Sequence, residues 1–303
     1  ILSFLLKTFG LKEWVLRLPV LVCGLASIYL SYQLSKKISG NFYVGLTTAF
    51  LMVTSEKHIF FSTNARGYLV VMVLALMVVH CFLKRIEGRG LKILGFSSSV
   101  NDALALTGWL SIWILATWTI PTFIFFEVSI ALLIAGCLLS VNVLTPAQKK
   151  SLFIPLFSTV LGCIGFYLQY YVLMEPAMLA EATSHAAQTS LPLFFPELLN
   201  EWISPFESAG LLFFLFALIG LARKFQGNRV AGILLAWVWV GPVLIAIAGF
   251  ILEKLPGVPH SRTFFYLQPF FLLLSVMGAE QATIGCLARI FHEKEVANPF
   301  QAI

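Results

Sequence analysis

The sequence is short of charge. Only 11% of its 303 residues are Asp, Glu, Lys or Arg, whereas soluble domains carry about 25%. Hydrophobic residues make up 59% of the chain, and its mean hydropathy is +0.91. This composition excludes a soluble globular domain and indicates an integral membrane protein.

The sequence also lacks cysteines at disulfide or metal-ligand spacing. Its five cysteines all fall in or at the ends of apolar segments, so we interpret them as small apolar residues. No metal-ligand set is predicted. The net charge of +6 does not indicate a nucleic-acid partner, because the basic residues form short clusters between apolar segments. A positive-inside distribution across a membrane explains this pattern better.

The apolar segments predict the fold class. We expect an all-α, polytopic transmembrane bundle over residues 1–303, with about nine spans of roughly 20 residues each. Residues 1–16 mix apolar positions with charged ones, which is typical of an interfacial helix. Residues 175–208 are predicted to form a long outer loop. The predicted spans are 18–34, 42–54, 68–83, 103–119, 122–143, 152–174, 209–222, 231–252 and 264–284.

Charge predicts how the spans are oriented. Thirteen of the 20 lysine and arginine residues fall in loops 35–41, 84–102, 144–151 and 223–230 and in the tail after residue 284. The positive-inside rule predicts that these loops lie in the cytoplasm. We expect the chain to be a multi-pass protein of the plasma (inner) membrane. Nine spans that end inside leave Ile1 outside. We interpret this as the loss of a first span and a first outer loop ahead of Ile1.

Three arginines precede predicted helices that run from outside to inside. They are Arg17, Arg66 and Arg262. The positive end of a helix disfavours a nearby cation unless an anion lies beside it, and helix N–H groups and guanidinium groups both bind phosphate. We therefore predict that these arginines surround a phosphate at the outer membrane surface. The alternative is that each side chain reaches the lipid headgroups by itself.

Other residues of the same outer segments are supporting candidates. The phenols of Tyr68 and Tyr266 could donate to the phosphate or join the interfacial aromatic belt. Further donors could come from Lys57, His58, Lys254 and His260, for which the alternative is a solvated loop position.

Acidic residues are scarce where chemistry needs them. Glu127 is the one carboxylate well inside an apolar span, and such acids are functional candidates; a salt bridge to an outer arginine is the alternative. Sugar transfer by direct displacement needs a base, commonly a carboxylate. The one aspartate, Asp102, lies near the predicted inner boundary. Either an outer glutamate serves as the base or the base precedes Ile1.

Three segments resemble motifs of the membrane-embedded GT-C glycosyltransferases of the protein mannosyltransferase and aminoarabinose transferase type. Residues 9–19 (FGLKEWVLRLP) look like the family's juxtamembrane helix and its Arg-Leu-Pro step. Residues 62–68 (STNARGY) are similar to its Ala-Arg-x-Tyr motif, and residues 262–269 to its late run of Arg, aromatic residues and Pro. Where the family has Glu before Ala-Arg, this chain has Asn64.

The resemblance implies a hexosyl- or pentosyltransferase that uses a polyprenyl-phosphate sugar. The acceptor would be a lipid, a glycan or a protein on the extracytoplasmic side. The resemblance does not decide whether transfer requires a divalent metal ion. Arg66, Tyr68 and Arg262 would contact the donor phosphate, and the catalytic acid would lie in the first outer loop, which this sequence lacks. One alternative is a lipid-phosphate transporter or flippase, which needs polar residues deep in several spans. The other is a non-catalytic membrane scaffold.

Overall fold

The computed structural model describes residues 10, 12–64, 66–87, 98–140, 144–173, 191–227, 229–252 and 260–290. Within these ranges every regular element is a helix, as predicted. The longer helices are α2 (Glu13–Ser39), α3 (Phe42–Thr54), α5 (Tyr68–Ile86), α6 (Ser98–Thr119), α7 (Ile124–Leu139), α9 (Phe153–Tyr167), α11 (Leu191–Ile203), α12 (Gly210–Gly227), α13 (Arg229–Ile251) and α14 (Gln268–Ile290). The short elements are α4 (Glu56–Thr63), η1 (Pro121–Phe123), α8 (Pro146–Ser151), η2 (Leu168–Leu173), η4 (Glu207–Ala209) and η5 (Ser261–Leu267).

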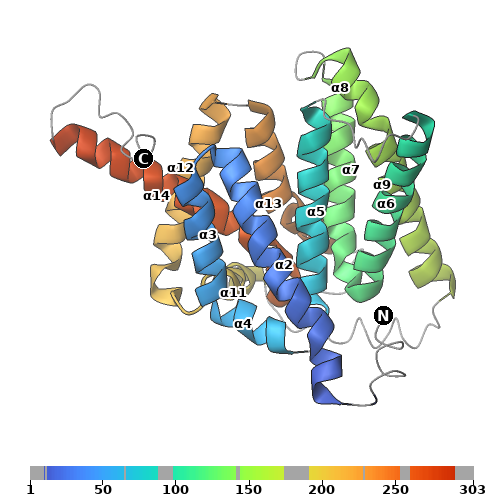
Figure 1. Cartoon of the computed structure of the whole chain (residues 1–303), viewed down its shortest axis with the longest axis horizontal. Coiled ribbons are helices and arrows are strands. Elements are labelled where there is room, and N and C mark those ends of the chain that lie inside the picture. Colours follow the sequence, from blue (N-terminus) through green and yellow to red (C-terminus); the bar gives the residue numbers. More distant parts are fainter. Residues whose placement is uncertain are drawn as a thin grey trace. The chain divides into compact units, whose positions relative to one another are not determined.

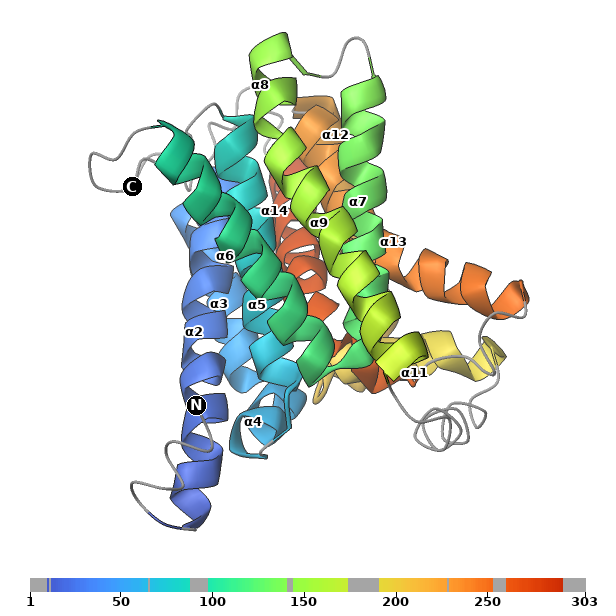
Figure 2. The same ribbon diagram turned by 90° about the vertical axis from the view of Figure 1, so that its right-hand side faces the viewer.

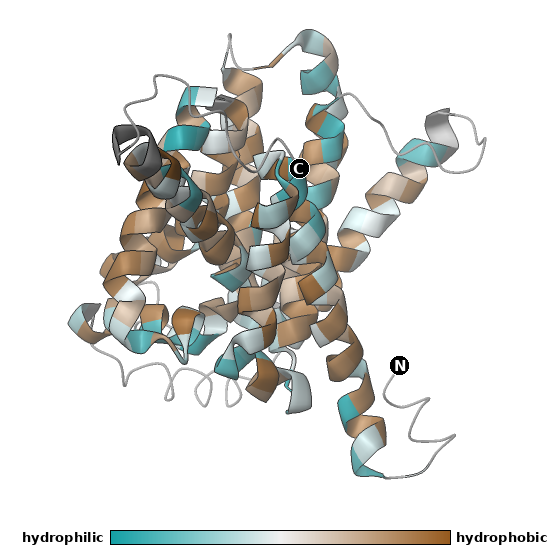
Figure 3. Cartoon of the chain, turned by 60° about the vertical axis from the view of Figure 1, so that its left-hand side comes forward, coloured by the Kyte–Doolittle hydropathy of each residue, from teal (hydrophilic) through white to brown (hydrophobic). Residues whose placement is uncertain are grey.

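Among the residues that the structure describes, seven helical stretches are long and apolar enough to cross a membrane. They are Glu13–Ser39, Tyr68–Ile86, Pro121–Leu139, Pro146–Tyr170, Glu207–Gly227, Val230–Ile251 and Ser261–Cys286. Large apolar side chains point outward from them, for example Leu25 (64% exposed), Leu139 (83%) and Leu211 (71%). Figure 3 shows this hydrophobic colouring along most helices. Such exposure is unfavourable in water and suits a lipid environment.

A helix occupies each of the nine predicted spans. Two of these helices, α3 and α6, are not among the seven that are long and apolar enough to cross a membrane. α3 has 13 residues, and at 1.5 Å per residue it reaches about 20 Å, against roughly 30 Å of hydrocarbon. α6 has 22 residues but is not among the seven stretches. The number nine therefore stays a prediction.

In two predicted segments, the helices differ from the prediction. α2 begins at Glu13, so residues 13–16 belong to the first span helix and not to a separate interfacial helix; Pro19 lies inside α2. Residues 1–9 of that predicted interfacial helix lie outside the described residues. The predicted outer loop 175–208 contains α11, a helix of 13 residues.

The chain forms two compact units, and α5 and α13 contribute to both. Unit 1 comprises Ile1–Val73, Pro196–Ala236 and Phe264–Ile303. Within it α2 and α3 form an antiparallel hairpin (Figure 1). Gly40 ends α2 in the left-handed region, at φ 76°, which glycine adopts without strain. Asn41 then begins α3, because its side chain accepts the Tyr43 N–H at 2.9 Å.

The pairing of α12 with α14 is the most extensive helix contact in unit 1. A Cβ on Gly220 would lie 2.1 Å from the Leu274 carbonyl oxygen, and one on Gly278 would lie 1.8 Å from that of Phe216. No side chain fits at either position. The two glycines therefore allow the backbones to approach closely, as small residues do in membrane helix pairs. α14 also packs against α3.

Unit 2 comprises Leu74–Phe195 and Trp237–Thr263. Its α6, α7 and α9 pack side by side (Figure 2). Gly162 on α9 lies against Glu127 of α7 and Trp113 of α6. The Trp237 indole on α13 donates to the Ser129 carbonyl on α7 at 2.6 Å, which fixes this half of α13 to the unit.

Contacts within each unit confirm that predicted inner loops share an end. In unit 1 the Lys224 ammonium donates to the carbonyl of Ile38, which joins the ends of α12 and α2. In unit 2 the Gln148 amide donates to the Ile86 carbonyl at 2.6 Å, and Arg85 donates to the Ser151 carbonyl at 3.2 Å. The C-terminal ends of α2 and α12 therefore lie together, and the end of α5 lies against α8.

Candidate functional site

Arg66 lies where the sequence predicts it, in the short connection between α4 and α5. Its backbone N–H donates to the Asn64 carbonyl at 2.6 Å, and α5 begins two residues later at Tyr68. The Val71 N–H donates to the Gly67 carbonyl at 3.1 Å, so the first-turn N–H groups of α5 have no acceptor within the helix. The Arg66 side chain is exposed and has no ion pair among the described residues. A guanidinium group and a helix N-terminus thus lie together and lack an anion.

The helix α4 that leads to Arg66 is fixed against α2 by His58. Its Nε2 lies 2.8 Å from the Ser27 hydroxyl oxygen, and the side chain is 3% exposed. Burial lowers the pKa of His58 to about 4, so the imidazole is neutral near pH 7. The prediction that His58 adds a phosphate donor is wrong, because the ring faces α2 and not the outer surface.

A polar cluster connects α4 with the ends of α11 and α14 at the predicted outer side of unit 1. We call Ser55, Glu56, Trp202, Ser204 and Gln268 the outer cluster. The Glu56 N–H donates to the Ser204 carbonyl at 3.1 Å, and the Ser204 hydroxyl returns a bond to the Glu56 carboxylate at 2.8 Å. The buried Gln268 amide donates to the Ser55 hydroxyl at 2.9 Å and to the Trp202 carbonyl at 2.8 Å.

The outer cluster was missed by sequence reasoning. One local signal was present: Ser55 caps α4 by accepting the His58 N–H at 3.3 Å, and Ser followed by an acidic residue is typical of a helix start. The partners of this cap come from residues more than 140 positions away. No local pattern identifies them.

Aromatic contacts join α4 to the start of α5 and to η5. The Phe61 ring lies 4.6 Å from that of Tyr68 and 4.8 Å from that of Phe265. Tyr68 is partly exposed and follows Arg66 by two residues. Its contact with a phosphate therefore stays a prediction. Tyr266 is 1% exposed. The prediction that Tyr266 serves at the outer surface is wrong, because its side chain points into the core of unit 1.

Arg17 is placed differently from the prediction. It lies in the second turn of α2 and not ahead of the helix, because α2 begins at Glu13. Its guanidinium pairs with the Glu13 carboxylate at 2.5 Å, and both side chains are well exposed. The positive charge thus already has a partner, so Arg17 does not require a phosphate.

Arg262 lies in the first turn of η5, a short helix that leads into α14. It therefore precedes α14 but is itself part of a helix. It belongs to unit 2, together with the exposed His260, whereas Arg66 belongs to unit 1. The convergence of Arg66 and Arg262 on one anion therefore stays a prediction. Lys57 is a partly exposed residue of α4. Lys254 lies outside the described residues.

Glu127 is fully buried in the first turn of α7. Neither carboxylate oxygen has a hydrogen-bond partner among the described residues, and the same holds for the indole nitrogen of the buried Trp113. The predicted salt bridge between Glu127 and an outer arginine is thus not formed. Gly162 provides the space for the carboxylate, since a Cβ there would lie 1.8 Å from Oε1.

No protein-family model, curated protein or solved structure matches this chain. The chemistry of the site therefore rests on its residues. Arg66 and the start of α5 can bind an anion at a lipid-facing surface, because both present donors and positive charge. The outer cluster holds α4 in position for this.

Proposed function

We propose that this protein transfers a sugar from a polyprenyl-phosphate donor to a lipid, glycan or protein acceptor at the outer face of the membrane. One observation carries the proposal: Arg66 is exposed and unpaired among the described residues, at the N-terminus of α5. A membrane protein that exposes such a group at a helix start is suited to a lipid with a phosphate headgroup.

The chemistry explains why the phosphate needs a cation. The acceptor hydroxyl oxygen bonds to the anomeric carbon while the bond from that carbon to the phosphate oxygen breaks. The polyprenyl phosphate leaves with the electron pair and gains negative charge. Arg66 and the α5 N–H groups stabilise this charge as it develops, which lowers the barrier to transfer.

A base must take the proton of the acceptor hydroxyl. Glu56 is an outer carboxylate on the helix that leads to Arg66, and its backbone position is fixed by the bond to Ser204. It is the first residue to test in this role. Glu56→Gln keeps the size of the side chain and removes the basic oxygen, so a loss of transfer with unchanged donor binding would assign it as the base.

The experiment measures transfer in membranes that contain the protein and defined polyprenyl phosphosugars. Arg66→Ala should lower transfer by at least a hundredfold, because removal of one charge-stabilising donor typically costs that much. Arg66→Lys keeps the charge without the forked geometry and should retain partial activity. Lys12→Ala removes an exposed cation ahead of α2 and should leave transfer within threefold. Equal activity of the Arg66→Ala protein would refute the proposal.

One observation favours a lipid-phosphate transporter as the second candidate. Glu127 is a fully buried carboxylate in a span, without a hydrogen-bond partner among the described residues, and such residues mark transport pathways in other membrane proteins. Proteoliposomes with a fluorescent polyprenyl phosphate distinguish the two. Movement of the lipid between leaflets that Glu127→Gln stops, without any sugar transfer, would favour the transporter.

A further inference from the structure

A pocket of about 410 Å³ lies in unit 1 at the predicted inner end of the helices, at the other end of α3 from α4. Its volume is in the range of roughly 300–1,000 Å³ that holds small ligands. The lining residues come from the end of α2, the last turns of α12 and the second half of α14. They are Ser39, Arg223, Lys224, Gln226, Gly227, Met277, Glu280 and Gln281.

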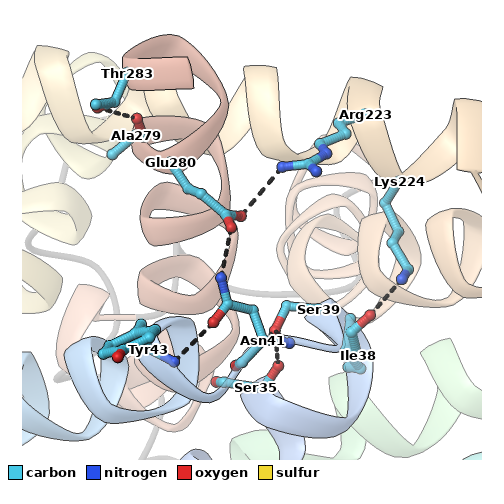
Figure 4. A network of polar contacts seen from close by, with 10 residues as sticks. All are labelled: Ser35, Ile38, Ser39, Asn41, Tyr43, Arg223, Lys224, Ala279, Glu280 and Thr283. Carbon is cyan, nitrogen blue, oxygen red and sulfur yellow. Dashed lines mark hydrogen bonds and ion pairs between the residues drawn. The ribbon is translucent and has the colours of Figure 1, made fainter. Parts of the chain in front are cut away.

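Glu280, the one acidic residue among the described residues that line the pocket, already accepts hydrogen bonds from protein donors (Figure 4). One carboxylate oxygen accepts from the Asn41 amide at 2.7 Å, and the other accepts from the Arg223 guanidinium at 3.1 Å. The Glu280 side chain is 11% exposed, whereas that of Arg223 is 38% exposed. Glu280 therefore positions Arg223 and leaves part of the guanidinium group accessible from the pocket.

Lys224 is also held in place by a hydrogen bond, and its ammonium group keeps further donors for a ligand. Its ammonium donates to the Ile38 carbonyl in the last turn of α2 (Figure 4), where a cation offsets the negative end of the helix. An ammonium group has three donors, so two remain. The carboxamides of Gln226 and Gln281 provide further donors at the pocket wall.

The described lining thus has two positively charged side chains and one carboxylate. The carboxylate already accepts hydrogen bonds from Asn41 and Arg223. A cation would meet Arg223 and Lys224, whereas an anion would meet several donors held in place. Basic pockets between transmembrane helices on the cytoplasmic side are suited to lipid phosphate headgroups. We propose that this pocket binds a phosphate group, carried by an anionic phospholipid or by a free phosphate compound.

The test titrates the purified full chain, in neutral detergent, with dioctanoyl phosphatidate and follows binding by calorimetry. The double variant Arg223→Gln/Lys224→Gln should raise Kd at least tenfold, because both charge-assisted donors are lost. The matched control is Lys84→Gln/Lys150→Gln, which removes two exposed cations from predicted inner loops outside the pocket. This control should change Kd less than twofold. Equal weakening by both double variants would overturn the proposal.

A second pair of variants keeps the test decisive if the loss of Arg223 and Lys224 disturbs folding. Gln281→Glu adds a negative charge to the pocket wall, and Thr283→Glu adds the same charge to an exposed position of α14 outside the lining. Only the first should weaken binding of dioctanoyl phosphatidate, by about tenfold. If neither variant changes Kd, the lipid does not bind here.

Two further probes identify the source of the phosphate. If inorganic phosphate displaces dioctanoyl phosphatidate at similar concentrations, the pocket is a free-phosphate site. If it fails to do so at a hundredfold excess, the pocket is a lipid headgroup site. Dioctanoylglycerol, which lacks phosphate, should not bind. Binding of dioctanoylglycerol with the same Kd would contradict the proposal, and none of these outcomes depends on Arg66.

Discussion

Nε2 of His58 and the hydroxyl oxygen of Ser27 lie 2.8 Å apart, and this buried contact joins α4 to α2. Gly24, one turn before Ser27, leaves room for the approach, since a Cβ on it would lie 3.0 Å from the Cβ of Ser62. α4 leads directly to Arg66. The position of Arg66 therefore depends on a helix contact that contains a titratable group.

This contact predicts a pH-dependent stability. Burial lowers the pKa of His58 to about 4 in the folded protein, against about 6.5 in the unfolded chain. The unfolded state binds the proton more readily, so the stabilisation is present above about pH 6.5 and is lost as the pH falls towards 4. The loss amounts to roughly 3 kcal/mol. Thermal unfolding in detergent at pH 7.5 and pH 5 should show a lower Tm at pH 5.

The control for this prediction is His58→Gln, which keeps a polar group able to bond to Ser27 but does not titrate. The variant should lose part of the difference in Tm between the two pH values. If wild type and variant show the same difference, the pH dependence comes from other groups and His58 is not buried as described.

The close crossing of α12 and α14 predicts a strong effect from a single methyl group. Gly278→Ala places a Cβ 1.8 Å from the Phe216 carbonyl oxygen, so the two helices must separate and lose contact along the crossing. Gly285→Ala on the same helix meets nothing within 4 Å. We expect the first change to lower Tm by several degrees and the second to leave it unchanged or slightly raised. Similar Tm values for both variants would exclude this crossing.

The contact between Gly162 and Glu127 predicts energetic coupling. Gly162→Ala places a Cβ 1.8 Å from Oε1 of Glu127, which the side chain can avoid only by moving. Shortening Glu127 to Ala removes the clash. The double variant should therefore be more stable than the sum of the two single effects predicts, with a coupling of about 1 kcal/mol or more in a double-mutant cycle of unfolding. Additive effects would show that the two residues are not in contact.

Apolar runs predicted where the helices lie, because a membrane helix needs a long uninterrupted apolar stretch. Arg17 shows where such reasoning fails. The predicted span began at residue 18, after Arg17, but α2 begins one turn earlier, at Glu13, and continues through Pro19. The four residues of α2 before Arg17 include Glu13, whose carboxylate pairs with the arginine.

α11 was missed for a different reason. Its buried residues Phe194, Leu198 and Trp202 are spaced four apart, which is a helical signal. Residues 175–208 were nevertheless predicted as one loop, and Pro196 lies inside the helix. In sites built from distant segments, no local signal identifies which residues become partners. Glu280 joins Asn41 and Arg223 across 239 and 57 positions, so the pocket around it required the structure.

The most direct test of the central claim measures binding of a polyprenyl monophosphate to the purified protein, independently of any sugar or acceptor. We predict that Arg66→Ala raises Kd at least tenfold, because the charge-assisted bonds to the phosphate are lost, whereas Lys12→Ala and Arg223→Gln/Lys224→Gln change it less than threefold. Binding by the Arg66→Ala protein with the same Kd as wild type would contradict the account.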